Sequence, residues 1–206
     1  MNANLDDAAL KSEQAPDPFD VFDAWFQEAI QSEINDPNAM TLATADATGM
    51  PDARTVLLKG HDARGFVFYT NLESAKGGAL AQNPRAALLF HWKTLRRQVR
   101  VRGPASAVES AEADDYYNSR PLQSRIGAWA SDQSRPAADR AELERRVSER
   151  SAEFGDHPPR PPHWSGFRVT PLAMEFWQDG AFRLHDRFLY SRPSPDAPWT
   201  VTRLYP

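Results

Sequence analysis

Cysteine is absent from this chain of 206 residues, which excludes disulfides, thiolate metal sites and a cysteine nucleophile. Only five histidines occur, and none of them forms an H-x-x-x-H pair, so no histidine-built metal site is expected. The chain also lacks the G-x-G-x-x-G and P-loop patterns of common nucleotide-binding folds and the G-x-S-x-G elbow of serine hydrolases. A bound nucleotide would therefore have to be held in another way.

The chain also has no large excess of one charge and no long apolar run. The 28 acidic and 24 basic residues leave a formal charge of −4, which argues against a nucleic acid as partner. No apolar run approaches membrane-spanning length, and the first ten residues show neither the basic start nor the apolar stretch of a signal peptide. We expect a cytoplasmic protein without a membrane partner, with one domain over residues 17–206 after a flexible segment over residues 1–16.

The apolar pattern predicts an N-terminal helix and then a series of short strands. Asp17 is suited to cap a helix and Pro18 to its first turn. Apolar residues then recur at helical spacing, at Phe19, Phe22, Phe26 and Ile30. From residue 39 the pattern is typical of strands separated by turn signals. The predicted strands are AMTLATAD, ARTVLLKG, GFVFYTN, AALLFHW and RQVRVRG.

Further helices and a second group of strands complete this prediction. The helices are ESAKGGALAQNP, SAEADDYYNSRP and PAADRAELERRVSERSAEF. The strands are GFRVTPLAMEFWQ, AFRLHDRFLYSR and WTVTRLYP, of which the first two are joined by a tight hairpin turn at Asp179-Gly180. Since most strands follow one another without a helix between them, we predict a mainly β fold with flanking helices, an antiparallel barrel rather than a Rossmann sheet.

The segment RTVLLK is the first of three clusters that suit an anion. Arg54 and Lys59 bracket an apolar strand, and Lys76 follows the turn at TNLESAK. Because side chains alternate along a strand, Arg54 and Lys59 are expected on opposite faces. The segment alone fits either an anion site or the ordinary charge found at strand ends.

The second cluster is YYNSRPLQS. Tyr116 and Arg120 lie four residues apart and therefore on one helical face. Pro121 is expected to end the helix, and Ser124 to reach round from the following loop. A phenol, a guanidinium and a hydroxyl that converge can bind a phosphomonoester. An exposed helix end without a ligand would have the same residues.

The third cluster is FRLHDRF, residues 182–188. On a strand, Arg183, His185 and Arg187 would share one face, which suits either a functional site or an edge strand kept polar against aggregation. The tight turn predicted before this strand would place Trp177 opposite Phe182 and off that face. Either the turn is longer or Trp177 meets a ligand from a different side. Basic residues also alternate in RRQVRVR, where a solvated strand face is expected rather than RNA binding.

In their order and spacing these clusters resemble the pyridoxamine 5′-phosphate oxidase family. The resemblance runs from about residue 17 to residue 206. It is carried by the stretches RTVLLK, VFYTN, RRQVRV, YYNSRPLQSRIGAWASDQS and EFWQDGAFRLHDRFLY. The combination of the last two stretches is highly specific.

The resemblance implies a split β-barrel flavoprotein that works as a homodimer, with FMN bound at the subunit interface. It also implies an oxidase that converts pyridoxamine 5′-phosphate and pyridoxine 5′-phosphate to pyridoxal 5′-phosphate. In such an enzyme a hydride passes from the C4′ carbon to FMN, and O2 reoxidises the flavin with formation of H2O2.

The family's functional residues can be carried over to matching positions. The FMN contacts fall on Arg54, Thr55, Val56, Leu57, Leu58, Lys59, Tyr69, Thr70, Lys76, Gln98, Gln133, Ser134, Trp177 and Arg187. The substrate contacts fall on Asp36, Lys59, Tyr116, Arg120, Ser124, Arg183 and His185. Of these, Arg183 and His185 lie near the reacting carbon and are the expected catalytic residues.

Two features depart from the family pattern. The family usually has Ser-Arg-Lys where this chain has Ser74-Ala75-Lys76, so one arginine expected to face the flavin phosphate is missing. Some members also carry an N-terminal Arg-Arg-x-Tyr segment that closes over the substrate, and residues 1–16 contain no match to it. The first departure bears on the affinity for FMN, and the second means that a lid from this segment is not assumed.

Two other functions compete with the oxidase. A related flavin oxidase could act on another compound, such as a phenazine precursor, but a substrate without phosphate would leave the cations of the second cluster unpaired. A non-catalytic carrier of FMN or pyridoxal phosphate would have no need of Arg183 and His185. We therefore favour the oxidase.

Overall fold

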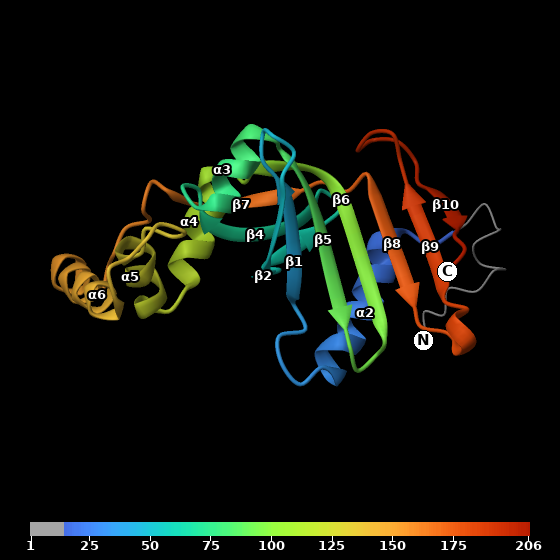
Figure 1. Cartoon of the computed structure of the whole chain (residues 1–206), viewed down its shortest axis with the longest axis horizontal. Helices are drawn as coiled ribbons and strands as arrows, with labels where there is room; N and C mark the ends of the chain where they lie inside the picture. Colours follow the sequence, from blue (N-terminus) through green and yellow to red (C-terminus); the bar gives the residue numbers. More distant parts are fainter. Residues whose placement is uncertain (1–14) are drawn as a thin grey trace.

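Residues 15–206 are described by the computed structural model of the chain, so the predicted flexible segment 1–16 falls almost wholly outside the described residues. The described part is a curled antiparallel sheet with flanking helices (Figure 1). The helices are α2 (Pro18–Ser32), α3 (Ala75–Gln82), α4 (Ser110–Ser119), α5 (Leu122–Ala130) and α6 (Arg140–Phe154). The strands are β1 (Ala39–Ala45), β2 (Pro51–Leu57), β3 (Gly60–Asp62), β4 (Gly65–Asn71), β5 (Arg85–Trp92), β6 (Arg97–Ala107), β7 (Trp164–Val169), β8 (Ala173–Gln178), β9 (Asp186–Ser191) and β10 (Thr200–Arg203).

The long strand β6 makes the sheet curl. Its first part, residues 97–102, pairs with β8, whereas residues 105–107 pair with β7. Gly103 lies at the change of partner, where a Cβ atom would stand 1.9 Å from the carbonyl oxygen of Thr170. Only glycine allows this approach, which brings β7 and β4 round beside the main path β10-β9-β8-β6-β5-β1-β2. The predicted mainly β split barrel with flanking helices is confirmed.

Helix α2 supplies much of the core. Its predicted cap is confirmed, because the Asp17 carboxylate accepts a hydrogen bond of 2.8 Å from the backbone N–H two residues on. Phe22 and Trp25 of α2 are 0% and 3% exposed. Phe22 packs edge-on against Phe66 of β4 and Phe90 of β5, with ring centroids 4.9 and 5.1 Å apart. The helix is therefore held to the sheet by aromatic burial.

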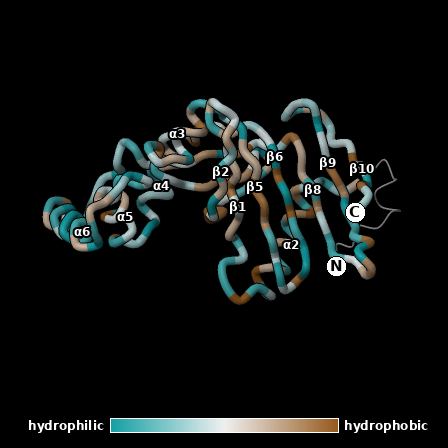
Figure 2. The backbone as a smooth tube through the Cα atoms, in the orientation of Figure 1, coloured by the Kyte–Doolittle hydropathy of each residue, from teal (hydrophilic) through white to brown (hydrophobic). Residues whose placement is uncertain are grey.

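Helices α4, α5 and α6 form an arm beyond one end of the sheet (Figure 1). None of the residues of α6 is buried, and Figure 2 shows it as mostly hydrophilic. Helix α5 was not predicted: Ser124 lies in it rather than in a loop, so that prediction is wrong. Pro121 ends α4 as expected but is also the N-cap of α5, because a proline suits a helix start as well as a helix end.

The predicted strand over residues 181–192 begins later than expected. Phe182 and Arg183 have positive φ angles of 58° and 67° and lie in a 3-10 turn, and β9 begins only at Asp186. The connection from β8 therefore spans residues 179–185 instead of two residues, and Trp177 pairs with Arg187. The prediction that Arg183, His185 and Arg187 share one strand face is wrong, because left-handed backbone breaks the alternation.

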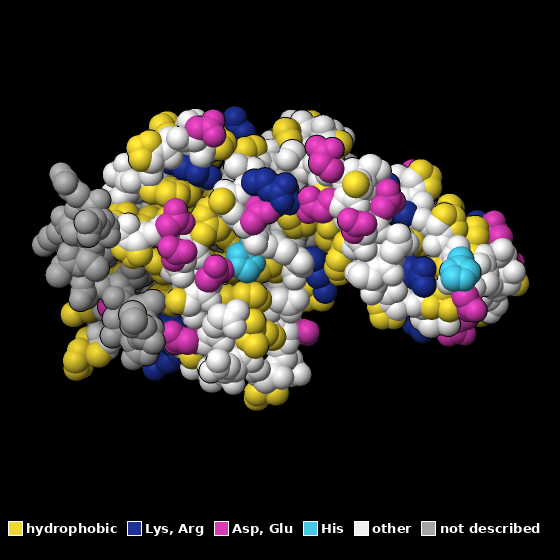
Figure 3. Space-filling model, turned by 180° about the vertical axis from the view of Figure 1, so that it is seen from behind, with side chains coloured by type: hydrophobic (Ala, Val, Ile, Leu, Met, Phe, Trp, Pro, Cys, Tyr) yellow, Lys and Arg dark blue, Asp and Glu magenta, His cyan; other side chains and the backbone are white. Residues whose placement is uncertain are grey.

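Two further features are relevant to binding partners, namely the distribution of charge on the surface and the apolar character of the helices. Seen from behind, acidic and basic side chains are interspersed over the molecule (Figure 3). Among residues 15–206, no helix has both the length and the apolar character that crossing a bilayer requires.

Candidate functional site

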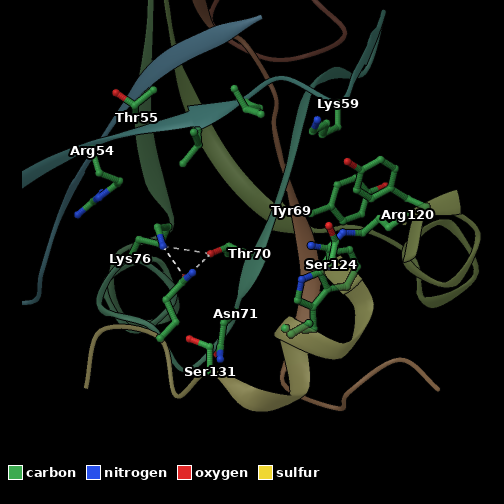
Figure 4. Close-up of a pocket in the computed structure, with 17 residues that line it drawn as sticks. Arg54, Thr55, Lys59, Tyr69, Thr70, Asn71, Lys76, Arg120, Ser124 and Ser131 are labelled. Atoms are coloured by element: carbon green, nitrogen blue, oxygen red, sulfur yellow. Dashed lines mark hydrogen bonds between the residues drawn. The ribbon is translucent and has the colours of Figure 1, made fainter. Parts of the chain in front are cut away.

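A pocket of about 570 Å³ lies between the barrel and the helical arm. Its volume falls within the range of roughly 300–1,000 Å³ that is usual for small-molecule sites. It brings together many of the predicted site residues, namely Arg54, Thr55, Val56, Leu57, Lys59, Tyr69, Thr70, Lys76, Tyr116, Arg120, Ser124 and Gln133. Sequence reasoning missed Asn71, Gly127, Ala128, Ser131 and Trp164. Figure 4 shows two groups of side chains in this pocket.

The first group surrounds Lys76, the second residue of α3. Its Nζ donates hydrogen bonds to Gln133 Oε1 at 2.8 Å and to Thr70 Oγ1 at 3.1 Å. Burial lowers the pKa of Lys76, and the nearby Arg54 guanidinium lowers it further. Two cations held together, at the N-terminus of a helix capped by Ser74, form a site where an anion would be stabilised.

Arg54 and Lys59 both line this pocket. Burial alternates from Arg54 to Lys59, with Arg54, Val56 and Leu58 less exposed than Thr55, Leu57 and Lys59, which agrees with the predicted placement of Arg54 and Lys59 on opposite faces. Beyond the end of β2 at Leu57, the backbone N–H of Lys59 donates to the carbonyl of Val67 at 2.9 Å. Arg54 itself pairs with Asp52, an exposed carboxylate on the same strand.

The second group contains Lys59, Tyr116, Arg120 and Ser124. Tyr116 stacks on Tyr69 with ring centroids 4.0 Å apart and 18° between the planes. Burial, and then the Glu112 carboxylate, raise the pKa of Tyr69 to about 12. The phenol of Tyr69 is therefore neutral at physiological pH.

Arg120 carries a charge that no acidic side chain of the described residues balances. Burial lowers the pKa of Arg120, and its Nη1 is buried without a hydrogen-bond partner. No acidic side chain within residues 15–206 pairs with it. A buried donor of this kind is costly unless a ligand accepts its hydrogen bond.

Half of the remaining predicted residues lie at the far end of the sheet. Gln98, Trp177 and Arg187 are direct neighbours across β6, β8 and β9 and therefore share one face. We name Trp177, Asp179, His185 and Arg187 the sheet-end cluster. In this chain the cluster is separate from the pocket.

Contacts within the sheet-end cluster are well defined. The Trp177 and His185 rings lie 4.6 Å apart. His185 Nδ1 is 3.2 Å from Asp179 Oδ1 and also 3.2 Å from the backbone nitrogen of Gly180. Arg187 binds Glu175 at 2.7 Å. The contacts with Asp179 and Gly180 hold the histidine ring against the tryptophan.

Four predicted residues lie in neither place. Asp36 has a φ of 43° in the loop before β1 and lines a separate cavity beside His91. Leu58 is 4% exposed and belongs to the core. Ser134 follows Gln133 with a φ of 72°, and Arg183 is exposed on the turn before β9.

Comparison with known proteins adds to this geometry. Residues 26–153 match the family model described as pyridoxamine 5′-phosphate oxidase, and residues 164–206 match the pyridoxine 5′-phosphate oxidase C-terminal dimerisation region. A curated pyridoxine/pyridoxamine 5′-phosphate oxidase of Maricaulis maris is 62% identical over 191 residues, which cover 92% of this chain and 86% of the relative. One from Nitrobacter winogradskyi is 60% identical over 194 residues, covering 94% and 91%.

Solved structures agree with the fold. PhzG from Burkholderia lata, in complex with tetrahydrophenazine-1-carboxylic acid, superposes with a TM-score of 0.86 at 32% identity, covering 92% of this chain and 93% of PhzG. An FMN-binding protein of Nostoc punctiforme, related to pyridoxamine 5′-phosphate oxidase, gives a TM-score of 0.74 at 17% identity, covering 93% of this chain and 99% of that protein, and supports the fold alone. With the two family models covering most of its length, the chain belongs to the pyridoxamine 5′-phosphate oxidase family.

Proposed function

We propose that the protein is an FMN-dependent oxidase that converts pyridoxamine 5′-phosphate and pyridoxine 5′-phosphate to pyridoxal 5′-phosphate. The observation that carries this proposal is the pair of cationic groups, around Lys76 and around Arg120, which face one pocket. Two phosphates, one on the cofactor and one on the substrate, match two such groups. The names of the curated relatives support the same reaction.

The first group fits the phosphate of FMN. Lys76 and Arg54 supply positive charge, and Thr70 supplies a hydroxyl. Burial and the neighbouring Arg54 lower the pKa of Lys76, and an anion bound beside it would offset both effects. Within the described residues, β2 is the edge strand of the main sheet path. The backbone groups of residues 54–57, which line the pocket, are therefore not covered by another strand on that side. When bound, FMN supplies the two-electron acceptor for the C4′ hydride and is reoxidised by O2 with formation of H2O2.

The second group fits the substrate phosphate. Lys59 and Arg120 provide charge, and Tyr116 and Ser124 provide hydroxyl donors. The buried Nη1 of Arg120 would gain the hydrogen-bond partner that it lacks. Because α4 and α5 both belong to the arm, the phosphate end of the substrate is held between arm and barrel.

The sheet-end cluster is proposed to act in a homodimer. The matched dimerisation region contains Trp177, His185 and Arg187, none of which reaches the pocket of its own chain. Phe182 and Tyr205, on the turn before β9 and near the C-terminus, are both 94% exposed, as residues that pack against a second copy would be. We propose that each copy places its cluster over the pocket of the other.

The residues of the cluster then orient the substrate and move protons. Oxidation of the amine requires its neutral form, and a histidine ring can take or give a proton near neutral pH. Arg187 can stabilise negative charge that develops on the flavin ring. Arg183, exposed on the same turn as His185, can reach a substrate on the facing copy. A cytoplasmic location stays a prediction.

A simple experiment tests the function. The purified protein should show a flavin spectrum, and anaerobic addition of pyridoxamine 5′-phosphate should bleach it until air is admitted. A colourless protein that binds no added FMN, or a flavin that the substrate does not bleach, would contradict the proposal. A bound flavin that the substrate does not bleach would favour a non-catalytic carrier of FMN or pyridoxal phosphate over an oxidase.

The PhzG likeness is the one observation that favours a second function, oxidation of a phenazine precursor. Its identity of 32% is about half that of the curated oxidases. The cationic group around Arg120 also argues against it, because a substrate without phosphate would leave these charges unpaired. Bleaching by a reduced phenazine carboxylic acid, with no response to pyridoxamine 5′-phosphate, would reverse this preference.

A further inference from the structure

Arg120, which is partly buried, differs from the buried Arg168 in how its charge is held. Arg168 of β7 is 9% exposed and binds both Asp62 and Glu112, at 3.1 and 2.8 Å. Arg120 has no acidic partner within residues 15–206, and its Nη1 lacks any hydrogen bond. Something other than a carboxylate must therefore hold its guanidinium at the pocket.

The group in contact with it is the indole of Trp164. The guanidinium carbon of Arg120 lies 4.9 Å from the centroid of the Trp164 ring, which lines the pocket and is 6% exposed. An aromatic face attracts a cation through its quadrupole and carries no net charge. The indole thus stabilises the guanidinium without neutralising it, and the positive charge stays available to an anion.

The indole is itself fixed by a stack of rings. Tyr69 lies nearly parallel to Trp164, with 7° between the planes and 5.3 Å between centroids. Tyr116 stacks on Tyr69 and is itself nearly parallel to Trp164, at 6.1 Å between centroids. Tyr116 and Arg120 are one helical turn apart on the arm. Both are therefore placed through rings that come from β4 and β7, and Figure 4 shows Tyr69 and Arg120 close together.

The backbone around Trp164 is arranged to keep this stack in place. Gly166 pairs with Tyr69 across the strands, and a Cβ atom there would meet the Tyr69 ring at 2.8 Å. The missing side chain lets the ring lie flat over β7. Arg160 donates to the Trp164 carbonyl at 2.8 Å and to Asp114 of α4 at 2.5 Å, which ties the start of β7 to the arm.

We propose that Trp164 is a positioning residue that holds the Arg120 guanidinium, with its charge un-neutralised, for the substrate phosphate, and so sets the preference for phosphorylated over unphosphorylated substrate. This inference rests on the proposed function. It assigns Trp164 no part in flavin binding or in the transfer of the hydride. The loss of the indole should therefore appear in substrate affinity and not in turnover.

The test compares Trp164→Leu with Trp164→Phe and uses Trp199→Leu as a matched control. Trp199 makes a similar contact with Arg192, at 4.2 Å, but lies outside the pocket. With pyridoxamine 5′-phosphate as substrate, Trp164→Leu should raise KM about tenfold while kcat changes less than about twofold. Trp164→Phe, which keeps a flat ring, should give a smaller rise, and Trp199→Leu none.

Three further readouts separate positioning from general damage. The kcat/KM for unphosphorylated pyridoxine and the flavin content should both stay at parental values in Trp164→Leu, whereas the inhibition constant of inorganic phosphate should rise with KM. A parental KM in Trp164→Leu, or equal losses on both substrates, would overturn the inference. If Trp164→Leu does not fold, an unchanged phosphate inhibition constant in Trp164→Phe would overturn it alone. A parental protein that does not oxidise pyridoxamine 5′-phosphate would instead refute the proposed function.

Discussion

The pocket and the sheet-end cluster differ in whether their basic side chains have acidic partners. In the pocket, Lys59, Lys76 and Arg120 form no ion pair with an acid of the described residues, and Arg54 alone pairs, with the exposed Asp52. In the sheet-end cluster, Arg187 binds the buried Glu175, which also binds Arg100, and His185 lies beside Asp179.

This difference separates binding from orientation. A partly buried cation without a counter-ion is costly in the free protein and is relieved only when an anion arrives, so the pocket is organised for phosphates. A cation that already has its carboxylate gains less from a new anion but is held in a defined geometry. The pocket is therefore expected to control affinity, and the sheet-end cluster and the turn beside it to control the rate of the chemical step.

The largest expected effect concerns the catalytic step. Arg183→Ala and His185→Ala should each lower the anaerobic rate of flavin reduction by ~10²-fold or more, because orientation of the substrate by Arg183 and proton transfer by His185 each contribute on that scale, while FMN stays bound. Stopped-flow reduction with pyridoxamine 5′-phosphate measures the rate, and the flavin spectrum measures retention.

Asp186→Asn is the control for this pair. Asp186 starts β9 and pairs with Arg203 at the exposed sheet edge, so the change should cost at most about 1 kcal/mol of stability and leave the reduction rate unaltered. Parental reduction rates in both alanine variants would mean that this turn is only a polar edge, and the contrast between the two regions would fail.

A second test divides the pocket itself. Arg120→Ala should raise KM for pyridoxamine 5′-phosphate by roughly 10- to 150-fold, the equivalent of one charge-assisted hydrogen bond, with little loss of FMN. Arg54→Ala should do the reverse. Steady-state kinetics and flavin titration of both variants give the comparison. Equal flavin loss in the two would show that the phosphate sites were assigned to the wrong groups.

The outcome so far shows what local sequence signals can predict. The start of the helix capped by Asp17 and the bounds of the strand GFVFYTN were predicted correctly, since capping, strand-forming composition and turn signals are local properties. The turn at residues 181–185 was not, because Phe182 and Arg183 adopt left-handed backbone that non-glycine residues rarely show. Tertiary contacts decide such conformations.

The site shows the same division. The resemblance located Arg54, Lys76 and Arg120, and the structure brings them to one pocket. It did not point to Trp164, whose role depends on strand pairing with β4 and on the missing side chain of Gly166. The proline-rich segment before Trp164 was a weak signal. It predicts a loop but does not indicate that the tryptophan after it lines the pocket.

A third prediction concerns the position where the family has arginine. Ala75 is exposed as the first residue of α3, beside Lys76. Ala75→Arg should tighten FMN binding up to about tenfold at low salt, and the gain should shrink as salt screens the charge. Without FMN the same change should lower stability slightly, since a cation at a helix N-terminus opposes the helix dipole.

Ala75→Gln is the uncharged control for this experiment. Flavin fluorescence titration at two salt concentrations measures the affinity, and thermal unfolding of the flavin-free protein measures the stability. If Ala75→Arg binds FMN no better than Ala75→Gln, another group already fills the role of the missing arginine.

The smallest expected effect is a difference between two tyrosines. The pKa of Tyr69 in the pocket and that of Tyr190 in the core are both raised to about 12, in each case first by burial. A raised phenol pKa means that the folded state favours the neutral form. The stability from each group is thus complete below the ordinary pKa of about 10 and is lost as pH rises toward 12.

Ligands should act on only one of the two groups. Phosphate or FMN adds negative charge to the pocket, which disfavours the phenolate of Tyr69 and should move its ionisation to still higher pH, while Tyr190 should not respond. Ultraviolet titration of the parental protein, Tyr69→Phe and Tyr190→Phe, each with and without inorganic phosphate, isolates the two groups, with circular dichroism defining the folded range. A phosphate-dependent shift that persists in Tyr69→Phe would place the anion elsewhere, and the pocket would lose its distinction from the rest of the molecule.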